Sequence, residues 1–204
     1  NIIDILKAKK NTTEENGMRN AHIRDGVALT KFIYWIKNTK NNSQSEISAS
    51  NYLDNLRSKN KNFFSLSFPT IAGSGPNGAI VHYRASKKTN RKLKKDDLFL
   101  VDSGAQYFDG TTDVTRTIAF SKVTNEQKKM YTLVLKGHIA VALSTFNEKE
   151  SGKTLDRHAR KFLKKEKLNF DHGTGHGVGS FLNVHESPPS ISPLSKYKFK
   201  KGMI

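Results

Sequence analysis

Apolar residues recur at helical spacing in the first part of the chain. From Thr12 to about Lys37 they fall near one face, which predicts a helix with one buried stripe of Met18, Ala21, Ala28, Phe32 and Ile36. Thr12 can cap the first turn, because Glu15 follows three positions later and can reach back to it. A second, shorter helix is predicted from a cap near Ser45 to about Arg57.

Branched and aromatic residues then replace the helical period. Phe63 to Ala72 predicts a strand, and Gly73 to Gly78 predicts a loop because it is rich in glycine and contains proline. We expect the chain to return to the sheet at Ala79 to Arg84, which would place His82 in a strand beside the loop. By itself, His82 is equally consistent with a core residue and with a site residue.

A hairpin is predicted around Asp109-Gly110. A short apolar run from Leu98 to Val101 ends in Asp102, and polar and apolar residues alternate from Thr111 to Phe120. Asp-Gly is a strong turn signal between two such segments. The sequence therefore predicts two antiparallel strands joined by a tight reversal.

The second half of the chain repeats the order of helices and then strands. Thr124 and Gln127 form another capping pattern, which opens a helix to about Phe146, and a further helix is predicted from Thr154 to Lys167. The remaining predictions are a strand through residues 172–179, a strand that ends at His185 before Pro188 and Pro189, a basic connection over residues 190–201, and a strand that begins at Phe199. Helices followed by paired strands, twice over, predict an α+β fold.

Composition places the chain among globular proteins with one domain. Its 204 residues are 35% hydrophobic and 26% charged, which is enough for a proper core. No run approaches the roughly 20 apolar residues of a membrane span, and no signal peptide is visible. The absence of cysteine excludes disulfides and fits a reducing compartment, so we expect a cytoplasmic protein without a membrane partner.

The net charge of +17 raises the question of a nucleic-acid partner. The densest basic run comprises Lys87, Lys88, Arg91, Lys92, Lys94 and Lys95. Lysine greatly outnumbers arginine, and the run lies between two predicted strands without aromatic residues on which bases could stack. We interpret it as a solvated loop and expect no nucleic-acid partner.

The predicted hairpin brings the carboxylates of Asp102 and Asp113 near each other. They would lie directly opposite only if the turn centred between Tyr107 and Phe108, so a bulge or a diagonal pairing is expected. Two buried carboxylates repel, and the pKa of one rises unless a cation lies between them. Taken alone, such a pair is more often one aspartate in a turn and one on a solvated edge.

Glycine occupies every second position from Gly173 to Gly179, and the positions between carry His172, Thr174, His176 and Val178. Helix is disfavoured because each interior glycine costs about 1 kcal/mol. A strand with this pattern has one bare face, which another backbone or a ligand can approach closely, and one face with two imidazoles and a hydroxyl. His172 and His176 are therefore candidate functional residues.

Two aspartates and one imidazole suit a hard or borderline divalent ion such as manganese, cobalt, iron or zinc. Three ligands are too few for a two-metal site, in which the ions lie about 3.5–4 Å apart. Any further ligands would have to be glutamate, aspartate or histidine, because the chain has no cysteine.

These motifs resemble a known family. VDSGAQYFDGTTDVTRT, which contains Asp102 and Asp113, and HGTGHGVGSFLNVHE, which contains His176, are similar to the metallopeptidases of the pita-bread fold and, among them, to the aminopeptidase P (Xaa-Pro aminopeptidase) family. The resemblance extends to GPNGAIVHYR, EENGMRNAHIRDGVALTKFIYW and SGKTLDRHAR. It therefore covers nearly the whole chain.

The resemblance implies a role for each candidate residue. Asp102 would bind one metal ion, Asp113 would bridge two, and His176 would bind one through its imidazole. Three further histidines would line the substrate site and serve catalysis by hydrogen bonding the peptide or its tetrahedral intermediate: His82, His172 and His185.

The implied fold is an α+β pita-bread domain, an antiparallel sheet with helices outside, in two halves related by an approximate twofold. Residues 1–204 would be an incomplete catalytic domain, because the family has a preceding domain and completes its site with two glutamates after a Gly-Met pair. This sequence stops at Gly202-Met203-Ile204, so we expect a fragment that is inactive alone. Ser187 also stands where the family commonly has glycine.

The implied activity is hydrolysis of the amino-terminal residue from peptides with proline in second position. Two divalent ions, manganese by expectation and zinc or cobalt as alternatives, would supply a bridging hydroxide, and a homodimer is compatible with the family. The alternatives are a prolidase, a methionine aminopeptidase, a creatinase-like hydrolase, and a pita-bread domain that binds a partner protein without catalysis. The set of histidines favours aminopeptidase P.

Overall fold

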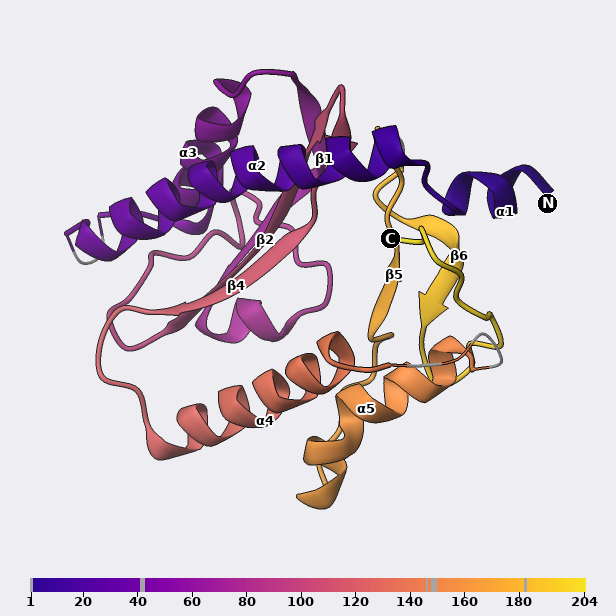
Figure 1. The fold of residues 1–204 in the computed structure, drawn as a ribbon. Helices are drawn as coiled ribbons and strands as arrows, with labels where there is room; N and C mark the ends of the chain where they lie inside the picture. Colours follow the sequence, from indigo (N-terminus) through magenta and orange to yellow (C-terminus); the bar gives the residue numbers. More distant parts are fainter. Residues whose placement is uncertain (1, 41–42, 146, 148–149, 182) are drawn as a thin grey trace. The chain divides into compact units, whose positions relative to one another are not determined.

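The structure, a computed structural model, describes residues 2–40, 43–145, 147, 150–181 and 183–204. The chain divides into two compact units. The large-sheet unit comprises Thr12–Lys122 and Gly179–Val184. The small-sheet unit comprises Asn1–Asn11, Val123–Val178 and His185–Ile204. Figure 1 draws both and labels most of their helices and strands.

The large-sheet unit contains an antiparallel sheet built around its second strand (Figure 1). Its strands are β1 (Phe63–Ser74), β2 (Leu98–Tyr107), β3 (Gly110–Thr111) and β4 (Val114–Ala119). β2 pairs with β1 along one edge and with β3 and β4 along the other. The predicted strand from Phe63 and the predicted hairpin are therefore confirmed.

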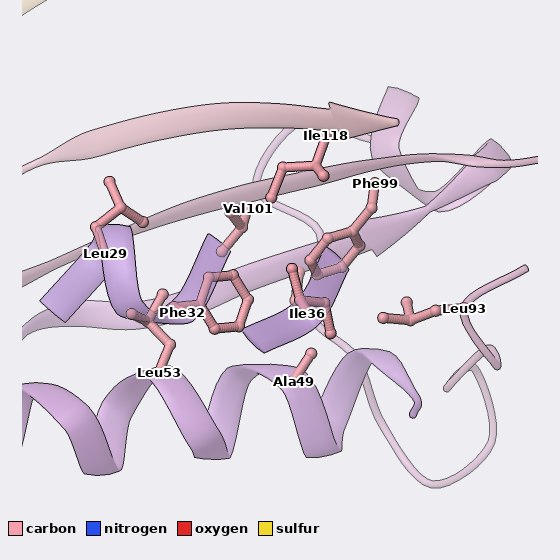
Figure 2. Close-up of a cluster of buried hydrophobic side chains, with 10 residues drawn as sticks. Leu29, Phe32, Ile36, Ala49, Leu53, Leu93, Phe99, Val101 and Ile118 are labelled. Atoms are coloured by element: carbon pink, nitrogen blue, oxygen red, sulfur yellow. The ribbon is translucent and has the colours of Figure 1, made fainter. Parts of the chain in front are cut away.

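Two helices, α2 (Thr12–Asn38) and α3 (Glu46–Ser58), pack against this sheet and bury its main apolar cluster (Figure 2). Phe32 of α2 and Phe99 of β2 are both 0% exposed, and each such side chain contributes about 1.5–3 kcal/mol through burial. Because side chains alternate along a strand, β2 turns Phe99 and Val101 towards the helices and Asp102 towards the opposite face.

Both predicted helices of this unit are confirmed, with a difference at one end. Ser45 caps α3 as predicted, since its hydroxyl accepts from the Ser48 N–H at 3.2 Å while its own N–H donates to the Ser48 hydroxyl at 2.8 Å. Thr12 was expected to cap the helix from the position that precedes it, but it is the first residue of α2 itself.

The predicted strand over Ala79–Arg84 is wrong. β1 is followed by a 3-10 helix, η1 (Gly75–Ala79), and then by a turn outside any sheet. The backbone folds back on itself here, so that Gly78 lies close to Gly73. A Cβ on Gly73 would lie only 2.7 Å from the Gly78 nitrogen, so the glycine permits this approach. His82 has a φ of 55°, a left-handed conformation that a strand does not contain.

The small-sheet unit contains a two-stranded antiparallel sheet with helices beside it. Its elements are α1 (Ile2–Ala8), α4 (Asn125–Ala142), α5 (Gly152–Lys165), β5 (Gly175–Gly177) and β6 (Glu186–Ile191). The predicted cap of α4 is confirmed, because the Thr124 hydroxyl accepts from the Gln127 N–H at 3.1 Å. α4 and α5 approach closely at Gly137, where a Cβ would lie 2.1 Å from the carbonyl oxygen of Ala159.

The helix boundaries in this unit differ modestly from prediction. α4 ends at Ala142, and its expected end, Phe146, lies outside the described residues. α5 begins before Thr154 and ends at Lys165. α1 was not predicted, and it is a helix of only seven residues whose large apolar side chains are exposed.

The strand predictions in this unit are largely wrong. The predicted strand over residues 172–179 is reduced to Gly175–Gly177. β6 begins after His185 and runs through Pro188 and Pro189 instead of ending before them. The pairing register explains this: Gly177 pairs with Glu186 and the preceding residue pairs with Ser190, so both prolines lie in an irregular stretch without ladder positions to fill.

The segment that begins at Phe199 forms no strand, contrary to prediction, and makes isolated contacts instead. The Lys10 N–H donates to the Gly202 carbonyl oxygen at 2.7 Å, and Lys9 forms a β-bridge with Met203. The Lys10 side chain is fully buried and forms an ion pair with Glu186. Residues from both ends of the sequence thus hold this unit together.

The predicted α+β class is confirmed, since helices and antiparallel strands occur in both units. No helix among the described residues combines the length and apolar composition that a membrane-spanning segment requires.

Candidate functional site

The β2 hairpin places Asp102 and Asp113 on one face of the large sheet. Tyr107 pairs with Gly110 and Asp102 pairs with Thr115, so the turn consists of Phe108 and Asp109. Asp113 precedes Thr115 by two positions and therefore lies diagonally across from Asp102. The sequence left a bulge or a diagonal arrangement open, and the diagonal arrangement is the one that forms.

The carboxyl group of Asp102 is in an electrostatically unfavourable place. Its Oδ1 atom is buried and has no hydrogen-bond partner among the described residues. Burial is the main reason that its pKa lies above the ordinary value; a hydrogen bond from Thr115 lowers the pKa, and the nearby Asp113 carboxylate raises it. A cation at this position would satisfy the oxygen and remove the repulsion, so the two aspartates fit a metal ion.

His82 belongs to the same unit and lies close enough for its charge to lower the pKa of Asp102. It is exposed and lies in the segment Ser74–Arg91, which we call the His82 loop. Its neighbour Tyr83 is 6% exposed and points into the unit. The loop therefore presents one imidazole to solvent beside a buried aromatic anchor.

The small-sheet unit brings two of the other candidate histidines together. His176 lies in β5, opposite Ser190, and His185 directly precedes β6. The imidazole rings of His176 and His185 are 4.0 Å apart between centroids and nearly perpendicular, at 72°. A Cβ on Gly177 would lie 2.7 Å from the Glu186 carbonyl oxygen, so this glycine permits the close approach of β6.

The imidazoles of His172 and His176 each have a defined orientation. The Nδ1 atom of His176 lies 2.8 Å from the carbonyl oxygen of Gly177, and that of His172 lies 2.8 Å from the carbonyl oxygen of Gly173. A carbonyl oxygen only accepts, so a neutral imidazole in this position carries its proton on Nδ1 and its lone pair on Nε2. His176 therefore presents the nitrogen lone pair that a metal ion binds.

His172 lies in residues 169–174, the His172 loop, which a buried ion pair on α5 holds in place. Arg160 donates to the carbonyl oxygen of His172 at 2.7 Å and also to that of Phe170. Its guanidinium lies 3.8 Å from the centre of the Phe170 ring. Asp156 accepts from Arg160 at 2.9 Å and from the Thr174 hydroxyl at 2.7 Å.

The structure thus places the candidate residues in two sets. The large-sheet unit holds Asp102, Asp113 and His82, and the small-sheet unit holds His172, His176 and His185. Across the described ranges, no group of at least three histidine, cysteine, aspartate or glutamate side chains is gathered tightly enough to hold a metal ion.

Sequence reasoning assigned no role to two buried charged groups that hold the histidine loops. One is Glu46, which is 0% exposed, and the other is the Asp156–Arg160 pair, of which each residue is 3% exposed. An acidic residue in the first turn of a helix is ordinarily a surface group that favours the helix dipole, and charged residues further along a helix ordinarily lie on its solvated face. No signal in the sequence separates these residues from that common case.

Comparison with known proteins identifies close relatives. Residues 16–204 match the Peptidase_M24 model, metallopeptidase family M24. The chain is 52% identical over 198 residues to the probable Xaa-Pro aminopeptidase P of Paracoccidioides brasiliensis strain Pb03, covering 96% of this chain and 32% of the relative. For the protein of the same name in Podospora anserina the identity is 50%, covering 94% of this chain and 28% of the relative. The chain therefore spans about a third of the length of these curated relatives.

Solved structures show the same likeness. The X-prolyl aminopeptidase of Caenorhabditis elegans, described as a cytosolic enzyme with a di-nuclear active site, superposes with a TM-score of 0.91 at 42% identity, covering 97% of this chain and 33% of that one. The prolidase of Pyrococcus furiosus superposes with a TM-score of 0.87 at 27% identity, covering 99% of this chain and 57% of that one. The expected pita-bread fold is thereby confirmed.

Proposed function

The chain belongs to metallopeptidase family M24, and from this we propose that residues 1–204 belong to the pita-bread catalytic domain of a metal-dependent Xaa-Pro aminopeptidase. Such an enzyme hydrolyses the amino-terminal residue from peptides with proline in second position. The names of the fungal relatives and the 42% identity to the C. elegans X-prolyl aminopeptidase support this substrate class.

The observation that carries the proposal is the Asp102–Asp113 pair. A buried carboxylate oxygen without a hydrogen-bond partner, beside a second carboxylate, destabilises a protein unless a cation compensates it.

We propose Asp102, Asp113 and His176 as metal ligands for two divalent ions, with manganese as the native metal and zinc or cobalt as alternatives. Carboxylate oxygens and an imidazole suit all of these ions. The di-nuclear active site described for the C. elegans enzyme supports the number of ions. When bound, the ions would supply Lewis acidity for activating water and polarising the scissile carbonyl.

The remaining histidines would bind and orient the peptide. His172 presents Nε2 as an acceptor, because its Nδ1 faces the Gly173 carbonyl oxygen. It can accept a hydrogen bond from a peptide N–H in this state, and once protonated at Nε2 it can donate to a developing oxyanion. We propose His82 and His185 as further substrate-binding residues, which would hydrogen bond the peptide or its tetrahedral intermediate.

Partners and location follow the same proposal. The substrates would be proline-containing peptides, and the cellular site would be the cytoplasm, as the description of the C. elegans enzyme as cytosolic suggests. A homodimer is compatible with the proposal, and light scattering of the complete gene product measures it directly.

Two alternatives differ in measurable ways. A prolidase would cleave only dipeptides with proline in second position, and the lower identity to the P. furiosus prolidase, 27%, makes it the weaker candidate. A pita-bread domain that binds a partner protein without catalysis would neither need a metal ion nor turn over peptide. Methionine aminopeptidase and creatinase-like activities differ in the substrate that they accept.

The test uses the complete gene product, which contains this chain, stripped of metal and then supplied with Mn²⁺. We expect hydrolysis of a Xaa-Pro-Xaa peptide and little hydrolysis of the matching Xaa-Ala-Xaa peptide. Asp113→Asn should abolish both metal binding, measured by calorimetry, and turnover. Changes to groups that only support metal ligands cost about 10–100-fold in metal affinity or activity. Loss of a metal ligand itself should cost at least that much.

Asp96→Asn is the matched control, since it is the same change at an exposed aspartate of the same unit. It should leave metal binding and turnover unchanged. Circular dichroism shows whether the Asp113→Asn protein stays folded. Full activity of a folded Asp113→Asn protein would overturn the assignment of the metal site.

A further inference from the structure

Glu46, the first residue of α3, is 0% exposed although it carries an ionisable side chain. Each of its carboxylate oxygens faces donors from the His82 loop. Oε1 accepts from the Ser74 N–H at 2.8 Å and from the Asn77 amide at 3.0 Å. Oε2 accepts from the Tyr83 hydroxyl at 2.9 Å and from the Arg91 N–H at 2.9 Å.

These four donors span the whole loop, from its first residue to its last. A carboxylate only accepts hydrogen bonds, so it suits a site where every neighbour donates. The loop has little regular structure of its own beyond η1, and its polar backbone groups need partners elsewhere. The single carboxylate of Glu46 therefore accepts hydrogen bonds from both ends of the loop and from its middle.

The contact with Tyr83 transmits this anchoring to His82. Burial is the main reason that the pKa of Tyr83 lies above its ordinary value, and the Glu46 carboxylate raises it further, so the hydroxyl keeps its proton and donates. The hydroxyl also lies 3.1 Å from the Thr89 carbonyl oxygen and 2.7 Å from the Asn77 amide nitrogen. Tyr83 is therefore fixed within a network that begins at Glu46.

His82 itself has a backbone conformation that needs such support. A φ of 55° is uncommon for a residue other than glycine and persists only where the surrounding structure holds it. Asn77 before His82 and Tyr83 after it are both bound to Glu46. The exposed imidazole meanwhile lies close enough to Asp102 to influence its pKa.

We infer that Glu46 is a positioning residue, which acts through Asn77 and Tyr83 to hold the His82 imidazole at the substrate site beside the aspartate pair. The inference deepens the proposed function and rests on it for the role of His82. Glu46 itself would touch neither the metal ions nor the peptide.

The test is Glu46→Gln in the metal-loaded complete gene product. A glutamine keeps the shape of glutamate but turns an N–H₂ group towards a loop donor, so the loop should loosen. We expect kcat/KM for a Xaa-Pro-Xaa peptide to fall about 10-fold to 100-fold, as a misplacement of about 1 Å can produce. Mn²⁺ content should not change, and amide hydrogen exchange of residues 75–91 should accelerate.

A matched control is Asp54→Asn, which makes the same change on the same helix. The Asp54 carboxylate accepts from the Thr70 hydroxyl of β1 at 2.6 Å. Among the described residues, no hydrogen bond is seen between this carboxylate and the His82 loop. It should leave kcat/KM and the exchange of residues 75–91 at wild-type values. If Glu46→Gln does not fold, Asn77→Ala removes one link of the same network and should produce a smaller change in the same direction.

A double-mutant cycle separates positioning from a general loss of stability. If Glu46 acts through His82, Glu46→Gln should add little to the loss caused by His82→Ala. Additive losses, or unchanged exchange of the His82 loop in Glu46→Gln, would overturn the inference. If the wild-type protein hydrolyses no peptide, the proposed function fails instead, and NMR of the His82 imidazole with and without Glu46→Gln still decides whether Glu46 positions it.

Discussion

The His82 loop and the His172 loop are held by buried charges of opposite sign. At the His82 loop an acid, Glu46, collects N–H and O–H donors. At the His172 loop a base, Arg160, collects the carbonyl oxygens of Phe170 and His172. Each loop leaves backbone groups of one kind without regular partners, and the buried group supplies the complementary kind. A buried acceptor and a buried donor can therefore each hold an irregular backbone segment in place.

The two anchors differ in how their charge is compensated. Arg160 is paired with Asp156 on the same helix, four positions before it. Glu46 lies at the start of α3 and is surrounded by neutral donors of the loop, together with the favourable end of the helix dipole. Removing the charge of either Asp156 or Arg160 should therefore weaken the anchor on α5. The anchor on α3 depends on Glu46 and its hydrogen-bond donors alone.

The largest effect is expected from breaking the ion pair at the His172 loop. Arg160→Met removes the donors to two carbonyl oxygens and leaves Asp156 charged and buried without its partner. Loss of one member of a buried pair costs about 3–5 kcal/mol of the free energy of unfolding. Urea unfolding measures it.

A matched double variant sharpens that result. Asp156→Asn combined with Arg160→Met removes both charges and should recover part of the lost stability. If Arg160→Met alone cost less than about 1 kcal/mol, the ion pair would not be the anchor of the loop.

A smaller effect is expected at the other loop from Tyr83→Phe. The change removes one hydroxyl donor from Glu46 and keeps the buried ring. A hydrogen bond to a charged group contributes about 1.5–3 kcal/mol, so the free energy of unfolding should fall by about 2 kcal/mol. Tyr34→Phe, at a residue that is 73% exposed, is the control and should change stability little. Equal effects of the two changes would contradict the network at Glu46.

The smallest effect is expected from an exposed ion pair in the small-sheet unit. The hydrogen bond from Lys129, and then its charge, hold the pKa of Glu166 below the ordinary value of 4.5. The ionised form is therefore the one that the fold favours. Its contribution is present above the unfolded pKa and is lost as pH falls through the lower folded pKa.

Glu166→Gln should thus lower the melting temperature slightly at pH 7 and not at a pH below the folded pKa of Glu166. The difference at pH 7 should shrink in high salt, because exposed pairs are screened. A salt-independent loss as large as that of Arg160→Met would erase the distinction between buried and exposed pairs.

Local patterns predicted those parts of the structure that local interactions stabilise. The cap of α3 at Ser45 and the cap of α4 at Thr124 form between residues three positions apart, and both were predicted. The closeness of Asp102 and Asp113 also followed from the alternation of the hairpin and its Asp-Gly signal. Their roles as metal ligands remain predictions.

Distant contacts decide the parts that could not be predicted. The conformation of His82 depends on a hydrogen bond between Tyr83 and Glu46, which are 37 positions apart. β6 accommodates Pro188 and Pro189 only because its partner strand is irregularly paired there, which no property of the prolines reveals. Local propensity predicts a strand at His82 and a break at the two prolines, and tertiary contacts override both predictions.

The hydrogen bond from the Lys10 N–H to the Gly202 carbonyl oxygen has a consequence for folding during synthesis on the ribosome. The large-sheet unit is almost one continuous stretch, Thr12–Lys122, and can begin to fold as soon as that stretch has emerged. The small-sheet unit needs Lys9 and Lys10 to meet Gly202 and Met203, which are translated much later. The contacts of residues 9 and 10 therefore cannot form until residue 203 has left the exit tunnel, so the small-sheet unit is completed after the large-sheet unit has begun to fold.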